Sequence, residues 1–324
     1  MNVLYIIGNG FDIAQGMKTS YPDFYKTLNN KVYDASYWMQ QVVKDINTDI
    51  KLWSDMEEAL GAFTSKVTSV EDFEDLYFRL SDHLQEYLKN EEANFLPTKE
   101  LCNKCRKDVA TLSSYLGETD KISYQSFRNE RSSGEDITII TLNYTNTIEK
   151  LLSFNNTTIL DLGNGKYLRQ IIHVHGMLDD TIIIGVNNEE QIANKDFCTN
   201  DDVKDLLIKS QANITMKYDR HLLCEKRVRE ANLIILYGVS LGETDAYWWH
   251  LIGEQLKNRK SLAIIQFLYK PKEIIPTRKQ ILGRIERKQS ECLMRKFGLT
   301  KEEWYGNSIS DRVFFITNSN AFKL

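Results

Sequence analysis

Apolar residues are spaced in two different ways along this chain. From about residue 20 to residue 130 they recur every three or four positions among many charged side chains, which predicts a series of amphipathic helices. Pro97 marks a break between two of these helices. From Asp136 onward, short runs of Val, Ile and Leu predict buried strands instead. These runs cover residues 137–142, 171–174, 181–186, 233–238, 262–269 and 313–317.

The apolar runs are nearly continuous, and a similar run at residues 3–7 belongs with them. Strands of this kind are typical of a parallel sheet that is covered on both faces. We therefore predict an α/β fold with an open, mainly parallel, Rossmann-like sheet and a large helical insertion after the first strand and helix. The chain is predicted to form a single domain over residues 1–324, with residues 20–130 as a helical insertion subdomain. Residues 278–295 carry mixed charges and predict a further, solvated helix.

Composition narrows the class of protein. The 324 residues include 42% hydrophobic and 27% charged side chains, as in ordinary globular proteins. The 41 basic and 45 acidic side chains give a net charge of −4, so we expect no general attraction to nucleic acid. No apolar run reaches the roughly 18 residues of a membrane span. The first strand also lacks the basic leader and the cleavage site of a signal peptide. We expect a cytoplasmic protein without a membrane partner.

The five cysteines form neither a disulfide framework nor a zinc-site pattern. Cys102 and Cys105 are spaced as a C-x-x-C pair, but a structural zinc site needs a second pair at suitable spacing. The other three cysteines are scattered along the chain. We interpret the pair as two partly buried cysteines on a helix, and we predict no metal site.

The segment from Asn2 to Asp12 has the pattern of a first strand that turns through glycines into a helix. Gly8 and Gly10 allow a tight turn and a close approach of the backbone to a ligand. Main-chain N–H groups at the start of a helix are suited to a phosphate. The next glycine comes only at Gly16, so the dinucleotide-binding fingerprint is incomplete. An ordinary strand-to-helix turn is the alternative interpretation.

Four polar clusters fall at the carboxyl ends of predicted strands. They cover residues 8–12, 141–147, 173–176 and 238–245. In an open parallel sheet these strand ends meet at one crevice, where ligands bind. The sequence therefore predicts one small-molecule site that is built from non-consecutive strands.

Two of these clusters contain candidates for acid–base chemistry. His173 and His175 alternate along a strand, so their side chains should point to opposite faces. His175 is nearer the strand end and is the better candidate for a general base, whereas His173 is expected to pack within the fold. Asn143 is either a functional amide or a strand-end cap of the following helix. Ser240 stands in a G-V-S-L-G string that matches a nucleophile elbow, but we favour close backbone approach to a nucleotide.

Several motifs, in a fixed order, resemble those of the bacteriophage abortive-infection AbiH family. They are IIGNGFD, LWSDMEEAL, TLNYTNTIE, HVHG, IIIGVNN and YGVSLGETD, and they extend from the N-terminus to about Asp245. The resemblance implies a bacterial antiphage protein that acts inside the cell and is triggered on infection. A trigger derived from the phage is the partner that this implies.

The same motifs are similar, more distantly, to sirtuin-like NAD-binding domains. This resemblance implies a sirtuin-like sheet with NAD as ligand or substrate, and with Gly8 and Gly10 approaching the pyrophosphate. It implies that Asn143 positions the nicotinamide ribose or the attacking water, and that His175 is the general base. Gly238 and Ser240 would contact the adenosine side. The expected cofactor-binding residues are Gly8, Asn9, Gly10, Phe11, Thr141, Tyr144, Gly238, Ser240 and Asp245.

The sequence departs from the sirtuin pattern in two of the motifs. Asn9 replaces a small residue in the glycine turn, and Tyr144 and Thr145 stand where an acid follows the asparagine. The four-cysteine zinc ribbon of protein deacylases is also absent from the sequence. These differences argue against deacylation and favour a simpler cleavage of NAD.

Breaking the nicotinamide–ribose bond develops positive charge on the sugar, which a nearby carboxylate stabilises. Asp12 is the acid within the first motif, and Asp245 and Glu149 are the alternatives. The predicted catalytic set is Asn143, His175 and Asp12. We thus expect an antiphage protein that hydrolyses NAD or a related nucleotide. A non-catalytic nucleotide sensor and a nucleic-acid-processing toxin are the alternatives, and the helical insertion offers surface for a homo-oligomer.

Overall fold

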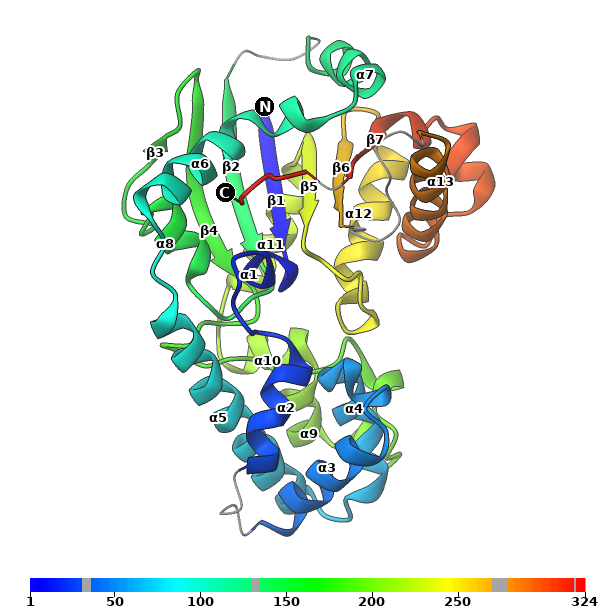
Figure 1. Cartoon of the computed structure of the whole chain (residues 1–324). Coiled ribbons are helices and arrows are strands. Elements are labelled where there is room, and N and C mark those ends of the chain that lie inside the picture. The colour runs from blue at the N-terminus through cyan, green and yellow to red at the C-terminus, as the bar shows by residue number, and fades with distance from the viewer. Residues whose placement is uncertain (31–35, 130–133, 270–278, 318, 324) are drawn as a thin grey trace.

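The structure is a computed structural model that describes residues 1–30, 36–129, 134–269, 279–317 and 319–323. Its centre is a seven-stranded sheet in the order β3-β4-β2-β1-β5-β6-β7 (Figure 1). The strands are β1 (Asn2–Ile7), β2 (Glu135–Thr141), β3 (Leu160–Asp161), β4 (Lys166–His173), β5 (Leu233–Tyr237), β6 (Ala263–Leu268) and β7 (Val313–Thr317). β3 pairs with β4 in the antiparallel sense, and the other pairs are parallel.

The mainly parallel sheet that the apolar runs predict is confirmed. β1 lies at its centre, and Ile7 is in register with Thr141 of β2 on one side and with Tyr237 of β5 on the other. The chain first adds β2 and β4 on one side of β1 and later adds β5, β6 and β7 on the other. Such a reversal of strand order opens a crevice beyond the carboxyl ends of the strands.

The prediction of a strand at residues 181–186 is wrong. Residues 182–186 are buried, but apart from one isolated bridge at Val186 the segment is not part of a ladder. Its main-chain groups at residues 183–185 bond instead to the hydroxyl groups of Tyr77 and Tyr144 and to the carboxylate of Glu57. An apolar run thus indicates burial, but it does not decide which groups satisfy the backbone.

Helices cover both faces of the sheet (Figure 1). One face packs against α6 (Lys99–Thr111), α7 (Glu118–Asn129) and α8 (Thr147–Leu152), and the other against α11 (Arg220–Glu230), α12 (Ala246–Asn258) and α13 (Lys279–Lys296). α13 confirms the predicted solvated helix, of which residue 278 lies outside the described residues. Within the described residues, no helix combines the length and the apolar character of a membrane span.

A second group of helices lies beyond the carboxyl ends of the strands, in the lower half of Figure 1. It consists of α2 (Tyr21–Asn30), α3 (Tyr37–Thr48), α4 (Met56–Phe63), α5 (Val70–Asn94) and α9 (Asp201–Leu207). We call this group the helical body. The predicted break at Pro97 is confirmed between α5 and α6, while residues 31–35 and 130 of the predicted helical zone lie outside the described residues.

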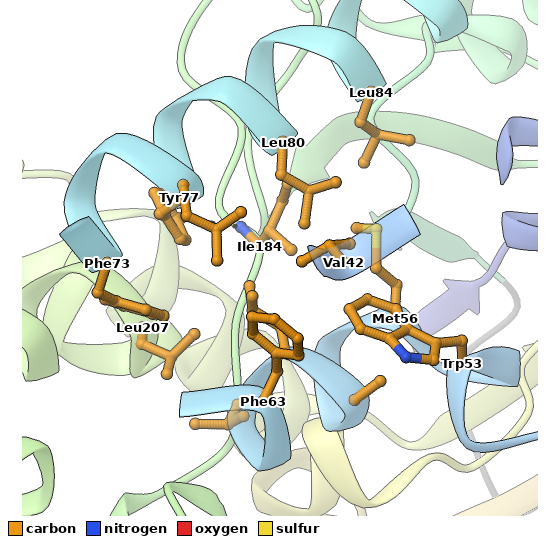
Figure 2. Close-up of a cluster of buried hydrophobic side chains, with 14 of the residues drawn as sticks. Val42, Trp53, Met56, Phe63, Phe73, Tyr77, Leu80, Leu84, Ile184 and Leu207 are labelled. Carbon is orange, nitrogen blue, oxygen red and sulfur yellow. Dashed lines mark hydrogen bonds between the residues drawn. The ribbon is translucent and has the colours of Figure 1, made fainter. Parts of the chain in front are cut away.

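The helical body has its own hydrophobic core, which is separate from the clusters on the two sheet faces. Figure 2 shows Trp53, Phe63 and Leu80 directed toward one another, with Leu207 contributed by α9. Burying a large apolar side chain stabilises a fold by about 1.5–3 kcal/mol. The helices predicted before residue 130 therefore divide between two cores, because α6 and α7 pack on the sheet.

Candidate functional site

A pocket of about 820 Å³ lies where the carboxyl ends of β1, β2, β5 and β6 face the helical body. The turns after these strands form one wall. The opposite wall includes Tyr21 of α2, Asp55 and Glu57 at the start of α4, and Leu84 and Leu88 of α5. Small-molecule sites typically have volumes of about 300–1,000 Å³. The pocket is therefore the crevice that the strand order predicts, closed on one side by helices.

The turns after β1 and β5 pack directly on each other. The N–H of Gly8 donates to the carbonyl of Tyr237 (3.0 Å), and the N–H of Gly10 donates to the carbonyl of Gly238 (2.9 Å). A Cβ atom on Gly10 would lie 2.7 Å from the Gly238 Cα, so the two turns need glycine for their close approach. The Phe11 N–H donates to the Gly8 carbonyl (2.9 Å). Main-chain donors that we expected to bind a phosphate are thus used within the fold.

Asp12 lies in α1 (Gly10–Ala14), and its carboxylate is buried beside the turn after β2. The Thr145 hydroxyl donates a hydrogen bond to Asp12 Oδ2 (2.5 Å). Burial raises the pKa of Asp12 to about 6, against the opposing effect of hydrogen bonds that include the one from Thr145. Asp12 Oδ1 has no hydrogen-bond partner among the described residues. Because buried polar atoms are normally satisfied, this oxygen is suited to a ligand hydroxyl or a water molecule.

Asn143 is held by its main chain. Its N–H donates to Thr141 Oγ1 (3.0 Å), and its carbonyl accepts a hydrogen bond from His173 Nδ1 (2.9 Å). His173 Nε2 lies 2.9 Å from Glu149 Oε1 of α8, so His173 is packed within the fold. The Asn143 side chain is buried, lines the pocket and lies close enough to the Asp12 carboxylate to lower its pKa, but neither its Nδ2 nor its Oδ1 forms a hydrogen bond of full geometry with a described residue. The strand ends therefore fix this residue and leave its amide available.

His175 belongs to a buried chain of charged side chains. Its Nε2 lies 2.9 Å from Asp245 Oδ1, which Lys209 Nζ also contacts at 3.0 Å. Lys209, the first residue of α10 (Lys209–Thr215), donates as well to Glu57 Oε2 (2.8 Å). The chain thus links the end of the sheet to α4 of the helical body. His175 lines both the main pocket and an adjoining cavity of about 30 Å³, and its Nδ1 has no partner among the described residues.

The charges of this chain follow from burial and from the position of the lysine. Burial pushes the pKa of Asp245 upward, but the Lys209 ammonium and His175 outweigh it and hold the pKa well below its usual range. Burial raises the pKa of Glu57 to about 7, despite the attraction of Lys209. Burial lowers the pKa of His175, and the Lys209 ammonium lowers it further. At neutral pH Asp245 is ionised, so His175 carries its proton on Nε2 and keeps a lone pair on Nδ1.

Most of the predicted site residues meet at the main pocket. Those that line it are Gly8, Asn9, Gly10, Asp12, Asn143, Tyr144, His175, Gly238, Ser240 and Asp245. Phe11 and Thr141 are not among the lining residues. Phe11 packs edge-on against Tyr237 and Phe322 in the sheet core, and Thr141 is fully buried in β2. These two side chains shape the strand ends and do not reach the pocket.

Ser240 lines the pocket, but its surroundings differ from those of a catalytic serine. Its side chain is exposed, and in the part of the chain that the structure describes no histidine hydrogen-bonds to its hydroxyl. His173 and His175 are instead bonded to Glu149 and Asp245. The geometry therefore lacks the base that an acyl-transfer serine needs.

Two acids at the start of α4, Asp55 and Glu57, and the lysine Lys209 were not predicted from the sequence. We call the two acids the acidic wall. Asp55 accepts hydrogen bonds from the N–H groups of Glu57 and Glu58 and so caps α4. These acids stand in the LWSDMEEAL motif, which we used only for the family resemblance. Lys209 stands in no motif, and its role depends on how α10 packs against the sheet.

The cysteine pair agrees with a structural role. Cys102 and Cys105 lie on α6, where Cys105 is buried, and both are free. Across the described residues, no three or more His, Cys, Asp or Glu side chains form a group that could hold a metal ion.

The fold and the pocket define an α/β protein with a small-molecule cleft at the carboxyl ends of a mainly parallel sheet. A family model described as bacteriophage abortive infection AbiH matches residues 4–267. The chain belongs to this family, as its motifs indicate, and the family associates it with abortive-infection defence against bacteriophage. No curated protein matches the chain significantly.

Proposed function

We propose that the protein defends the cell against phage by hydrolysing NAD or a related nucleotide in the main pocket. One observation carries this proposal. Asp12, Asn143 and His175, from the ends of three different strands, surround a single cavity with buried polar atoms that have no described partner. Unpaired buried atoms in a cleft are typical of a site that is completed by its ligand. We propose the cytoplasm as the place of action.

The geometry favours one of the three carboxylates as the group that would stabilise the developing positive charge. Asp245 is engaged by Lys209 and His175, and Glu149 is bonded to His173 outside the pocket lining. Of the three candidates, Asp12 alone lines the pocket without an ion pair to a described residue, and its buried Oδ1 has no described hydrogen-bond partner. It is therefore the acid that would stabilise the ribosyl cation.

The proposed reaction is a hydrolysis at C1′ of the nicotinamide ribose. The C1′–N1 bond breaks, nicotinamide leaves with the bonding electron pair, and the oxygen of water forms the new bond to C1′. His175 Nδ1 takes the proton that the water loses, because Asp245 holds the other ring nitrogen in its protonated form. The Asn143 amide would hold the ribose hydroxyls or the water.

Chromatography of reaction products tests the proposal. Purified protein is incubated with NAD and a panel of nucleotides, beside the Asn143→Ala and His175→Ala variants. We expect release of nicotinamide, with each variant about 10²–10⁴-fold slower. His250→Ala, which removes an exposed histidine outside the pocket, is the matched control and should keep its activity. Unchanged NAD both in this assay and in infected cells would count against hydrolysis.

A nucleotide sensor is the second candidate, and a specific contact favours it. Asn9 donates to the Thr19 carbonyl (2.8 Å) and accepts from the Thr19 hydroxyl (2.5 Å), so the β1 turn is tied to the segment that leads into α2. A ligand at the turn could act on the helical body through this contact. The sensor predicts tight binding without turnover, and the same incubation followed by calorimetry separates the two functions.

A further inference from the structure

We propose that the pocket recognises the ribosyl–base unit of its ligand and disfavours phosphate groups. Its substrate class would then be N-ribosyl compounds with or without phosphate groups. A nucleoside would bind about as tightly as the corresponding nucleotide. This inference rests on the proposed function, because it takes the main pocket as the ligand site. It goes further by stating which part of the ligand the site reads.

The charged side chains that line the pocket are nearly all acidic. They are Asp12, Asp55, Glu57, Asp245 and Lys323. Lys323 is the only cationic side chain among the described lining residues. Lys209 lies behind this wall, and its ammonium is already shared between Glu57 and Asp245. A phosphate entering the pocket would therefore meet an excess of negative charge.

The β1 turn is poorly suited to an anion, although glycine turns of this type often bind phosphate. The N–H groups of Gly8 and Gly10 donate to carbonyl groups of the β5 turn. Asp12 stands in the first turn of the helix that follows. An anion placed there would find its donors occupied and a carboxylate beside it.

A carboxylate also opposes anion binding at the start of α4 and at the turn after β5. Asp55 accepts the N–H groups of Glu57 (3.1 Å) and Glu58 (3.3 Å), so the helix provides its own anion. The Asp55 carboxylate also faces the turn after β5, because a Cβ atom on Gly242 would lie 3.5 Å from Asp55 Oδ2. The Asp55 carboxylate would thus repel a phosphate from the main-chain donors both at the start of α4 and in the turn after β5.

The same surroundings suit a ribose and a cationic base. Asp12 Oδ1 and the Asn143 amide offer two acceptors and one donor group without described partners, which matches the vicinal hydroxyl groups of a ribose. Nicotinamide bonded to ribose carries a positive charge, which the acidic wall attracts. The wall repels phosphate and favours the reacting half of NAD.

Calorimetric titration of the full chain tests the inference with matched ligand pairs. Nicotinamide riboside is compared with nicotinamide mononucleotide and NAD, and inorganic pyrophosphate is added as a competitor. We expect the nucleoside to bind within about threefold of NAD or tighter. Pyrophosphate at millimolar concentration should not displace it. Binding that tightens tenfold or more with each added phosphate would overturn the inference, and so would competition by pyrophosphate.

A charge variant sharpens the test. Asp55→Asn keeps an N-cap acceptor for α4 but removes the charge. We expect it to tighten the binding of nicotinamide mononucleotide by about fivefold relative to that of nicotinamide riboside, whose positive charge loses one attraction. Glu58→Gln removes the same charge from the exposed side of α4 and is the matched control, with no change for either ligand. Equal effects of the two substitutions would contradict the role of Asp55.

The outcomes separate this inference from the proposed function. If NAD is hydrolysed but nicotinamide riboside neither binds nor reacts, the hydrolase proposal stands and the inference fails. If nicotinamide riboside binds but neither it nor NAD is hydrolysed, the inference stands and the hydrolase proposal fails in favour of a sensor. If no ribosyl ligand binds, both fail.

Discussion

Asp12 and Asp245 are both buried acids at the edge of the main pocket, and their surroundings are opposite in character. Asp245 shares its Oδ1 with Lys209 and His175, and its pKa lies well below the usual range. Asp12 accepts a hydrogen bond from the neutral Thr145 hydroxyl and forms no ion pair among the described residues, and burial raises its pKa to about 6. We call these regions the paired end and the unpaired end of the pocket.

The comparison separates two uses of the same side chain. At the paired end, a carboxylate is neutralised by a lysine and holds a histidine in one tautomer, which is a positioning role. At the unpaired end, one carboxylate oxygen has no described hydrogen-bond partner and could stabilise positive charge in a ligand. The following predictions test this division, beginning with the largest expected effect.

Removing the lysine of the paired end should be severely destabilising. Lys209→Met leaves Asp245 and Glu57 buried without their cation, which typically lowers the free energy of unfolding by about 3–5 kcal/mol. Urea unfolding measures the loss. Lys226→Met, which breaks an ion pair with a lysine side chain that is 64% exposed, is the control and should change stability by less than about 0.5 kcal/mol. Similar values for the two variants would show that the paired end is not structural.

The unpaired end should behave in the opposite way, with stability gained as activity is lost. The folded pKa of Asp12 lies above its ordinary value of 3.8, so the folded state binds more protons between these pH values and stability falls as pH rises through about 6. Asp12→Asn should therefore stabilise the fold by about 3 kcal/mol at pH 8 and by about half that at pH 5. Urea unfolding at both pH values measures this. A destabilised Asp12→Asn variant at pH 8 would refute the unpaired environment.

Turnover should depend on pH through the same group. If ionised Asp12 stabilises the ribosyl cation, kcat/KM rises about tenfold per pH unit below 6 and levels off above it. His175 adds no limb above pH 6.5, because burial lowers its pKa and it is already neutral there. A pH–rate profile for nicotinamide release shows the limb. Activity that stays flat down to pH 5 would exclude Asp12 from this role.

The smallest effect concerns the hydroxyl beside Asp12. Thr145→Val removes a hydrogen bond that lowers the Asp12 pKa, so the acid limb of the pH–rate profile should move to higher pH. Thr138→Val, a buried position of β2 outside the pocket lining, is the matched control and should leave the limb in place. A limb that stays fixed in both variants would show that another group titrates.

The convergence of Asn143 and His175 could be predicted from the sequence for a simple reason. Parallel strands present their carboxyl ends at one edge, so polar residues that follow apolar runs meet there without knowledge of the loops. Gly8 and Gly10 were also found, but their N–H groups bond to the β5 turn. Their spacing revealed a close approach of backbone, and it could not tell a ligand from a neighbouring strand turn.

The acidic wall and Lys209 could not be derived in the same way. Asp55 and Glu57 come from a helix whose place over the strand ends depends on the packing of the helical body. Lys209 reaches Glu57 and Asp245 only because α10 begins beside them. The error at residues 181–186 has the same origin, since several main-chain groups of that segment bond to side chains from distant parts of the chain. Such contacts leave no periodic signal in the chain.

The walls of the pocket belong to different hydrophobic cores, since Leu84 and Leu88 pack in the helical body and Tyr237 packs in the sheet. A ligand that contacts both walls therefore stabilises the contact between the two cores by its binding free energy. With ligand bound, the core of the helical body and the core of the sheet would unfold together in a single transition at a higher temperature. Phage infection that depletes or supplies the ligand would then alter the lifetime of the protein as well as its activity.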